Sequence, residues 1–337
     1  MRSPLFLRLC LGSGAVFLAA AYWLHVHSRR HLASLALLVS LSALVLPVMF
    51  FAPSDPASAP RGATQFQVDL LNQLLVDRRL AELAAADMAK DPRRLSGHEA
   101  TIYSQSGEDG IIAEIFRRVG VTNRYFVEFG SGDGRENNTV LLLVAGWSGL
   151  WLEAHAEFVK TASETFQREA GEKRLIARQA FVTAENIEDL LRSANVPRAF
   201  DLLSIDIDRN DYWVWKAIGS YQPRVVVIEY NAVFPPGVSW VVNYEPTSYW
   251  DGSSHFGASL TALERLAREK GYSLVGCNLL GSNAFFVRSE LAGDKFASPL
   301  TAENHFQPAR YYFAWYKSGH PRRVQAPGQV EYRKPAR

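Results

Sequence analysis

The chain has 337 residues, and its 48% hydrophobic and 12% aromatic content can fill a large core, which excludes a wholly disordered protein. The 36 Lys and Arg residues nearly balance the 34 Asp and Glu residues, and a net charge of +2 gives no general positive field that would indicate nucleic acid as a partner. Two cysteines exclude a disulfide scaffold or a four-cysteine zinc site.

Two apolar stretches near the N-terminus predict a membrane anchor. Residues 32–52 carry no charge, and as a helix this stretch would measure roughly 31 Å, the thickness of a bilayer's hydrocarbon core. Residues 9–26 form a second apolar stretch, with Arg2 and Arg8 before it. We interpret the two as a transmembrane helical hairpin in a lipid bilayer. A signal peptide and a buried soluble hairpin are the alternatives, and the flanking charges do not decide the orientation.

The rest of the chain divides by composition. Residues 1–58 would hold the two spans and a proline-bearing linker. Residues 59–99 predict a helical stalk, because apolar residues recur there at helical spacing, and this apolar stripe would pack on the next domain or dimerise. Residues 100–318 predict the main domain, and residues 319–337 a basic flexible tail.

The main domain alternates short apolar runs with helical patterns, which is typical of a doubly wound α/β sheet. The predicted strands are 124–129, 150–153, 175–177, 201–205, 224–229, 273–277 and 284–287, and the predicted helices are 107–119, 136–145, 157–169, 185–194, 212–218 and 260–270. No helical pattern separates the last two strands, so these should pair antiparallel. The expected sheet has seven strands and is mostly parallel.

The first predicted strand ends in a glycine-rich turn, VEFGSGDG, which includes Glu128, Gly130 and Gly132. Glycines at this position let the backbone approach a nucleotide-like ligand, unless they serve only to make the turn. Glu153 ends the second strand 21 residues after Gly132, where an acid can accept hydrogen bonds from both hydroxyls of a ribose. Arg135 stands where a dinucleotide-binding fingerprint has its third glycine, and no phosphate-loop Gly-Lys-Ser/Thr follows.

Three stretches carry a resemblance to a known family: SQSGEDG at 104–110, VEFGSGDG followed by NNT, and DLLSIDIDRNDYWVW at 201–215. Over roughly residues 103–310 the chain resembles the class I S-adenosylmethionine (SAM)-dependent methyltransferases, and among them the FkbM-like group. The resemblance implies SAM as cofactor. It also implies residue roles. Glu128, Gly130 and Gly132 would line the methionine portion of the cofactor, and Glu153 would hold its ribose. Ala180 and Phe181 would border the adenine, and Asp206 would face the sulfonium.

Two of these residue assignments have structural alternatives. Phe181 would serve equally as core packing. In the first motif, the family comparison favours Gln105 as part of a lid near the cofactor, together with Glu108. Ser104 or Ser106 could instead cap a helix that begins near Gly107, with Glu108 only favouring its positive end.

Asp206, Asp208 and Asp211 follow the fourth predicted strand, and Glu229 and Asn231 lie at the end of the fifth, where α/β sheets place their ligands. One carboxylate, Asp206 or Asp208, would be a general base for a hydroxyl or amine acceptor. A less favoured alternative is a Mg²⁺ ion held by Asp206, Asp208 and Asn231. A third alternative is that Asp208 and Asp211 only cap the following helix.

The segment from Phe234 to Gly257 is long, aromatic and rich in turn residues, which is typical of an active-site loop. His255 is its candidate proton acceptor, and the aromatic faces with Asp251 could hold a polar ring; a loop simply packed on the domain is the alternative. The FkbM-like resemblance implies O-methylation of a glycan or a small metabolite.

The sequence therefore predicts a membrane-anchored SAM-dependent O-methyltransferase, with the soluble domain in the cytosol because SAM is made there. The alternative is a non-catalytic, membrane-tethered binding or trafficking module with the same fold. Neither the identity of the acceptor nor the oligomeric state follows from the sequence.

Overall fold

The computed structural model describes residues 61–311 and 329–332. The chain divides into two compact units, residues 1–74 and 75–337, and all the elements of the sheet belong to the second unit. Both predicted membrane spans lie outside the described residues. Among the helices of 61–311, none is long and apolar enough to cross a membrane.

Helices and strands alternate along most of the described chain. The helices are α3 (Arg61–Met88), the 3₁₀ turn η1 (Ser96–His98), α4 (Glu108–Val119), α5 (Val140–Val144), α6 (Ala156–Thr165), α7 (Gln167–Gly171), α8 (Ile187–Ser193), α9 (Asp211–Ala217), α10 (Leu260–Glu269), α11 (Ser289–Ala292) and α12 (Ala302–His305). The strands are β1 (Tyr125–Phe129), β2 (Ser148–Glu153), β3 (Leu175–Gln179), β4 (Ala199–Ile205), β5 (Gln222–Glu229), β6 (Val238–Val241), β7 (Tyr272–Cys277), β8 (Asn283–Arg288) and β9 (Gln329–Tyr332).

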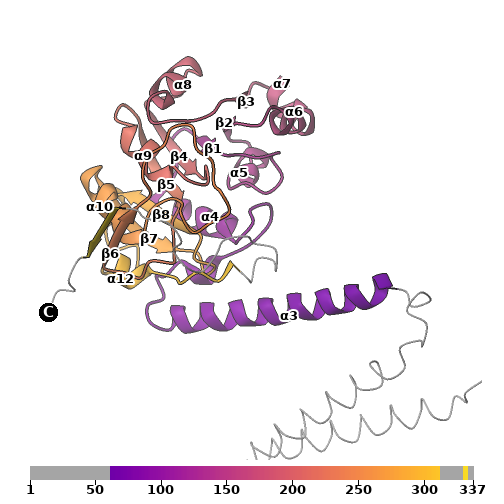
Figure 1. The fold of residues 1–337 in the computed structure, drawn as a ribbon, viewed down its shortest axis with the longest axis vertical. Coiled ribbons are helices and arrows are strands. Elements are labelled where there is room, and N and C mark those ends of the chain that lie inside the picture. Colours follow the sequence, from indigo (N-terminus) through magenta and orange to yellow (C-terminus); the bar gives the residue numbers. More distant parts are fainter. Residues whose placement is uncertain (1–60, 312–328, 333–337) are drawn as a thin grey trace, which may run out of the picture. The chain divides into compact units, whose positions relative to one another are not determined.

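The main sheet has seven strands in the order β3-β2-β1-β4-β5-β8-β7, and it lies at the centre of the second unit (Figure 1). Strands β1 to β5 pair parallel, and β8 pairs antiparallel with both β5 and β7. The predicted seven-stranded, mostly parallel doubly wound sheet is confirmed. The chain order reverses between β1 and β4, and such a switch point opens a crevice at the carboxyl ends of the strands.

Residues that alternate along the strands build a separate core on each face of the sheet. On one face, Val127 and Phe129 pack with residues of α8, α9 and α10. On the other, Phe126 and Trp151 pack with residues of α4 and α5. Because both faces are covered, the strands are apolar almost throughout, which made them recognisable in the sequence.

Some elements differ from the predictions. The helix predicted over 136–145 begins only at Val140, and the one predicted over 157–169 divides into α6 and α7 at Phe166, whose ring packs edge-on against Trp151. The helix of the predicted stalk ends at Met88. Strands β6 and β9 were not predicted; they pair antiparallel, and β9 lies within the segment predicted as a flexible tail.

Candidate functional site

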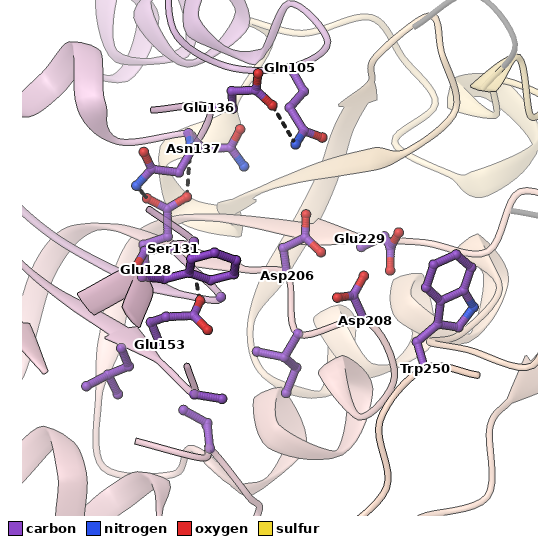
Figure 2. Close-up of a pocket in the computed structure, with 18 of the residues that line it drawn as sticks. Gln105, Glu128, Ser131, Glu136, Asn137, Glu153, Asp206, Asp208, Glu229 and Trp250 are labelled. Atoms are coloured by element: carbon purple, nitrogen blue, oxygen red, sulfur yellow. Dashed lines mark hydrogen bonds between the residues drawn. The ribbon is translucent and has the colours of Figure 1, made fainter. Parts of the chain in front are cut away.

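One cavity of about 800 Å³ lies at the carboxyl ends of β1, β2, β4 and β5 (Figure 2). All the residues predicted to bind the cofactor line it: Gln105, Glu128, Gly130, Gly132, Glu153, Ala180, Phe181 and Asp206. Asp208 lines it as well. Residues from separate parts of the chain thus meet at the predicted crevice, which is the arrangement expected of a binding site.

The turn after β1 needs glycine at Gly130 because β4 passes very close. Gly130 has φ +72°, and a Cβ there would lie 1.7 Å from the carbonyl oxygen of Asp206. Gly132 has φ +54°, but a Cβ there would meet no atom within 4 Å. The first glycine therefore permits the close approach of β1 and β4, and the second leaves its side of the turn open.

Glu153 is buried at the end of β2 and is held in place by backbone groups. Its Oε2 accepts a hydrogen bond from the Gly132 amide at 2.9 Å, and its Oε1 accepts one from the His155 amide at 2.9 Å. A carboxylate has about four acceptor positions. Glu153 can therefore accept two more hydrogen bonds, as a ribose diol would require.

Glu128 lines the cavity, but its carboxylate is already engaged. It accepts hydrogen bonds from Asn137 Nδ2 at 2.7 Å, the Asn138 amide at 2.8 Å and Thr139 Oγ1 at 2.5 Å. These bonds hold residues 137–139 against β1, which explains why α5 begins only after them. Three of the roughly four acceptor positions of the Glu128 carboxylate are thus taken by residues 137–139, and its role along the methionine portion of the cofactor stays a prediction.

Burial of Glu128 raises the pKa of its carboxyl to about 7, against the lowering effect of Thr139, Asn138 and Asn137. A raised native pKa means that protonated Glu128 stabilises the fold, and that this stability declines as pH rises from about 4.5 to 7. We expect the free energy of unfolding to be lower at pH 8 than at pH 5 by about 2–3 kcal/mol from this group. Urea unfolding at both pH values measures the difference, and Glu128→Gln should reduce it; an unchanged difference would contradict the assignment.

The SQSGEDG motif forms a compact turn at the edge of the cavity, and hydrogen bonds between its side chains and backbone hold it. Asp109 Oδ2 accepts hydrogen bonds from the amides of Ile102, Tyr103 and Ser104, and Ser104 Oγ accepts one from the Asp109 amide. Helix α4 has Gly107, at φ +89°, as its N-cap residue. Ser104 therefore satisfies an amide of the first helical turn from outside the helix, so the capping interpretation holds for Ser104.

The same motif also presents residues to the cavity, so the lid interpretation is compatible with capping. Glu108 Oε1 accepts hydrogen bonds from Asn278 Nδ2 and Asn283 Nδ2, both at 2.9 Å, which joins the motif to the turn between β7 and β8 and to the first residue of β8. Gln105 lines the cavity, and its Nε2 donates to Glu136 Oε2 at 3.4 Å (Figure 2). Glu136 was not predicted as part of the site.

Three acids converge on the opposite wall of the cavity. Carboxylate oxygens of Asp206, Asp208 and Glu229 all lie within 4.8 Å of one another, and Figure 2 shows the three side chains together. Burial, and then the charges of the neighbouring acids, raise the pKa of Asp206 and of Glu229 well above their ordinary values. Burial also raises the pKa of Asp208, with Glu153 as the next cause. Burial and mutual repulsion thus favour the protonated, uncharged forms of these three acids.

Asp211 and Asn231 have structural roles. Asp211 is buried in the first turn of α9, where its Oδ1 accepts a hydrogen bond from the Ile207 amide at 2.8 Å; the N-cap residue is Asn210. Asn231 Nδ2 donates to the carbonyls of Ser254 and Phe256. Asn231 does not line the cavity, and its Oδ1 accepts a hydrogen bond from the Val233 amide at 3.2 Å, so Asp206, Asp208 and Glu229 are the oxygen donors that lie together there. The three carboxylates offer oxygen ligands of the type that Mg²⁺ prefers.

Asp208 is not a cap. It is exposed to the cavity, and its backbone has φ +62°, a left-handed conformation that is uncommon for aspartate and recurs at functional sites. The capping interpretation is therefore wrong for Asp208, while Asp211 fixes the turn before α9 through the Ile207 amide and Asn210 is the N-cap residue.

His255 does not line the cavity. Its ring packs edge-on against Trp240, with 5.8 Å between ring centroids. We therefore keep Asp206 and Asp208, and not His255, as candidate proton acceptors. The loop before His255 does reach the cavity, through Ser248, Tyr249 and Trp250. The aromatic composition of this loop pointed to a site, but no sequence pattern distinguished these three residues.

The solved structures that resemble this one and are described below are methyltransferases, with low sequence identity and low TM-scores. The magnesium protoporphyrin IX methyltransferase ChlM from Synechocystis PCC 6803, solved with bound SAM, has 12% identity and a TM-score of 0.36, and the match covers 55% of this chain and 79% of that one. The N-terminal domain of EvdMO1, solved in the presence of S-adenosylhomocysteine (SAH) and D-fucose, has 16% identity and a TM-score of 0.35, over 53% and 80% of the two chains. The methyltransferase domain of bacterial CtHen1 has 14% identity and a TM-score of 0.34, over 54% and 97%.

Sequence comparison adds no family. No protein-family model matches the chain, and no curated protein matches it. The FkbM-like resemblance stays a prediction, and the function is drawn from the site residues.

Proposed function

We propose that the second unit is a SAM-dependent methyltransferase that acts on a hydroxyl of a glycan or a small metabolite. The observation that carries this proposal is the arrangement of Glu153 and Asp206 on either side of the glycine turn, in one cavity. A ligand with a ribose at one end and a positive charge near the other matches this pair. SAM has both features.

The charge of the cavity supports SAM over phosphate-bearing cofactors. Among its described lining residues, eight are acidic and one is an arginine, Arg135; the acids are Glu108, Glu128, Asp133, Glu136, Glu153, Asp206, Asp208 and Glu229. The ionised acids of this lining repel the pyrophosphate of a dinucleotide or the phosphates of ATP, and they attract the sulfonium and ammonium of SAM.

When bound, SAM supplies an electrophilic methyl group on a sulfonium. The residues of this chain position the reactants. Glu153 would orient the ribose, and Asp206, Asp208 or Glu229 would accept the proton of an acceptor hydroxyl at a carboxylate oxygen. Burial raises the pKa of each of these carboxyls, which makes each a stronger base than an ordinary exposed carboxylate once it is ionised.

We also propose that residues 1–58 anchor this domain to a membrane, with the domain in the cytosol. The support is the uncharged stretch 32–52 and the apolar stretch 9–26. The acceptor would then be a cytosolic metabolite, or a glycan presented at the membrane surface.

The test is cofactor binding by the full chain in detergent, measured by calorimetry. SAM and SAH should bind, and NADH should not. Glu153→Ala should weaken SAH binding about tenfold, because a charge-assisted hydrogen bond to the ribose is lost.

Glu157→Ala is the matched control, since Glu157 is an exposed acid near the same strand end, and it should bind SAH as the wild type does. Thermal unfolding checks that Glu153→Ala still folds. A folded wild type that binds neither SAM nor SAH would overturn the proposal in favour of the non-catalytic module.

A further inference from the structure

The loop of residues 245–252, here called the bridging loop, is fixed at both ends and exposed in the middle. At its start, Tyr244 Oη donates to Glu185 Oε2 at 2.5 Å, and the Glu245 carbonyl accepts from Asn210 Nδ2 at 2.9 Å. Just after its end, the carbonyls of Ser254 and Phe256 accept from Asn231 Nδ2. Because both ends are fixed, the position of the loop tip, which lines the cavity, is restricted.

Tyr249, at the tip, lines the end of the cavity that contains Phe181, a residue predicted to lie beside the adenine. Its ring is 4.9 Å from that of Phe181 and 6.2 Å from that of His155, measured between centroids. Phe181 follows β3 and His155 follows β2, so three segments supply one aromatic wall. Tyr249 is nevertheless 58% exposed, which leaves much of its ring free for a further contact.

Trp250, the next residue, joins the other end of the cavity. It lines the cavity together with Glu229 and Asp208, and Figure 2 draws its ring on the same side of the cavity as these two acids. The indole Nε1 donates to the Ser253 carbonyl at 2.6 Å, which fixes the ring relative to the loop backbone. Two neighbouring residues of one loop thus stand at the two ends of the same cavity.

We infer that the bridging loop is a wall shared by two ligands: Tyr249 stacks on the purine ring of the cofactor, and Trp250 forms a platform for the acceptor beside Asp208 and Glu229. This inference rests on the proposed function. An aromatic ring binds a purine through stacking of two flat apolar surfaces, which is worth about tenfold or more in affinity. Purine binding would hold the loop tip, and would thereby place Trp250 before the acceptor arrives.

Calorimetry with SAH on the full chain in detergent tests the inference. Tyr249→Ala should weaken SAH binding about tenfold, and Tyr249→Phe should retain it because the ring remains. Trp250→Ala should leave SAH affinity unchanged. Tyr249 is exposed, so its replacement is not expected to affect folding, and thermal unfolding of the variant tests this expectation.

A second probe assigns the effect to the purine. S-ribosylhomocysteine is SAH without adenine, and Tyr249→Ala should bind it as weakly as the wild type does. The inference is overturned if Tyr249→Ala binds SAH with wild-type affinity, if it loses S-ribosylhomocysteine affinity equally, or if Trp250→Ala loses as much SAH affinity. Failure of the proposed function is distinct, since the wild type itself would then bind no SAH.

Discussion

Gly130→Ala is expected to abolish SAM and SAH binding and to lower the free energy of unfolding by about 3 kcal/mol or more. The new Cβ would lie 1.7 Å from the carbonyl oxygen of Asp206, which is backbone and cannot rotate away. Strands β1 and β4 would have to separate at the point where the cavity begins. Urea unfolding and SAH calorimetry measure the two effects.

Gly132→Ala is the matched control, because the same turn receives the same methyl group at a position that opens to empty space. Gly132 has φ +54°, and a Cβ there meets no atom within 4 Å. Only the left-handed backbone conformation is then unfavourable, at about 1 kcal/mol. Equal losses of stability in the two variants would show that the conformation, and not the contact with Asp206, requires glycine at Gly130.

The sheet was predictable because its strands are buried on both faces. An apolar run such as that of β5 stands out between polar helical patterns, whatever its neighbours in the sheet. Strand β6 was missed for the opposite reason. It lies in an aromatic stretch typical of a loop, and its partner β9 comes from far along the chain, so only the folded structure brings the two together.

The site was predictable where a residue's role depends on the backbone. Gly130 and Glu153 follow directly after strands, and the sheet itself brings the ends of β1 and β2 together. The direction of a side chain in a loop depends instead on contacts that the sequence does not reveal. Asn231 donates to a distant loop, and His255 packs on Trp240, so both leave the cavity although their positions in the chain bring them near it.

The Asp206 carboxylate should make the cavity prefer SAM to SAH. SAM has a sulfonium where SAH has an uncharged sulfur, and an ionised acid facing this atom stabilises only SAM. Asp206→Asn is therefore expected to weaken SAM binding about 50-fold, while the change in SAH binding stays within about threefold. Asp133→Asn is the control, since Asp133 also lines the cavity but pairs with Arg135.

The same carboxylate makes the preference depend on pH. Burial and the charges of Asp208 and Asp211 raise the pKa of Asp206. The acid therefore ionises at a higher pH than an ordinary aspartate does. The ratio of SAM to SAH affinity in the wild type should therefore increase with pH, and it should be flatter in Asp206→Asn. Calorimetry with both ligands at pH 6 and pH 8 measures the ratio. A ratio independent of pH in the wild type would place the sulfonium away from Asp206, and a 50-fold loss shared by SAH would make Asp206 a structural residue of the site.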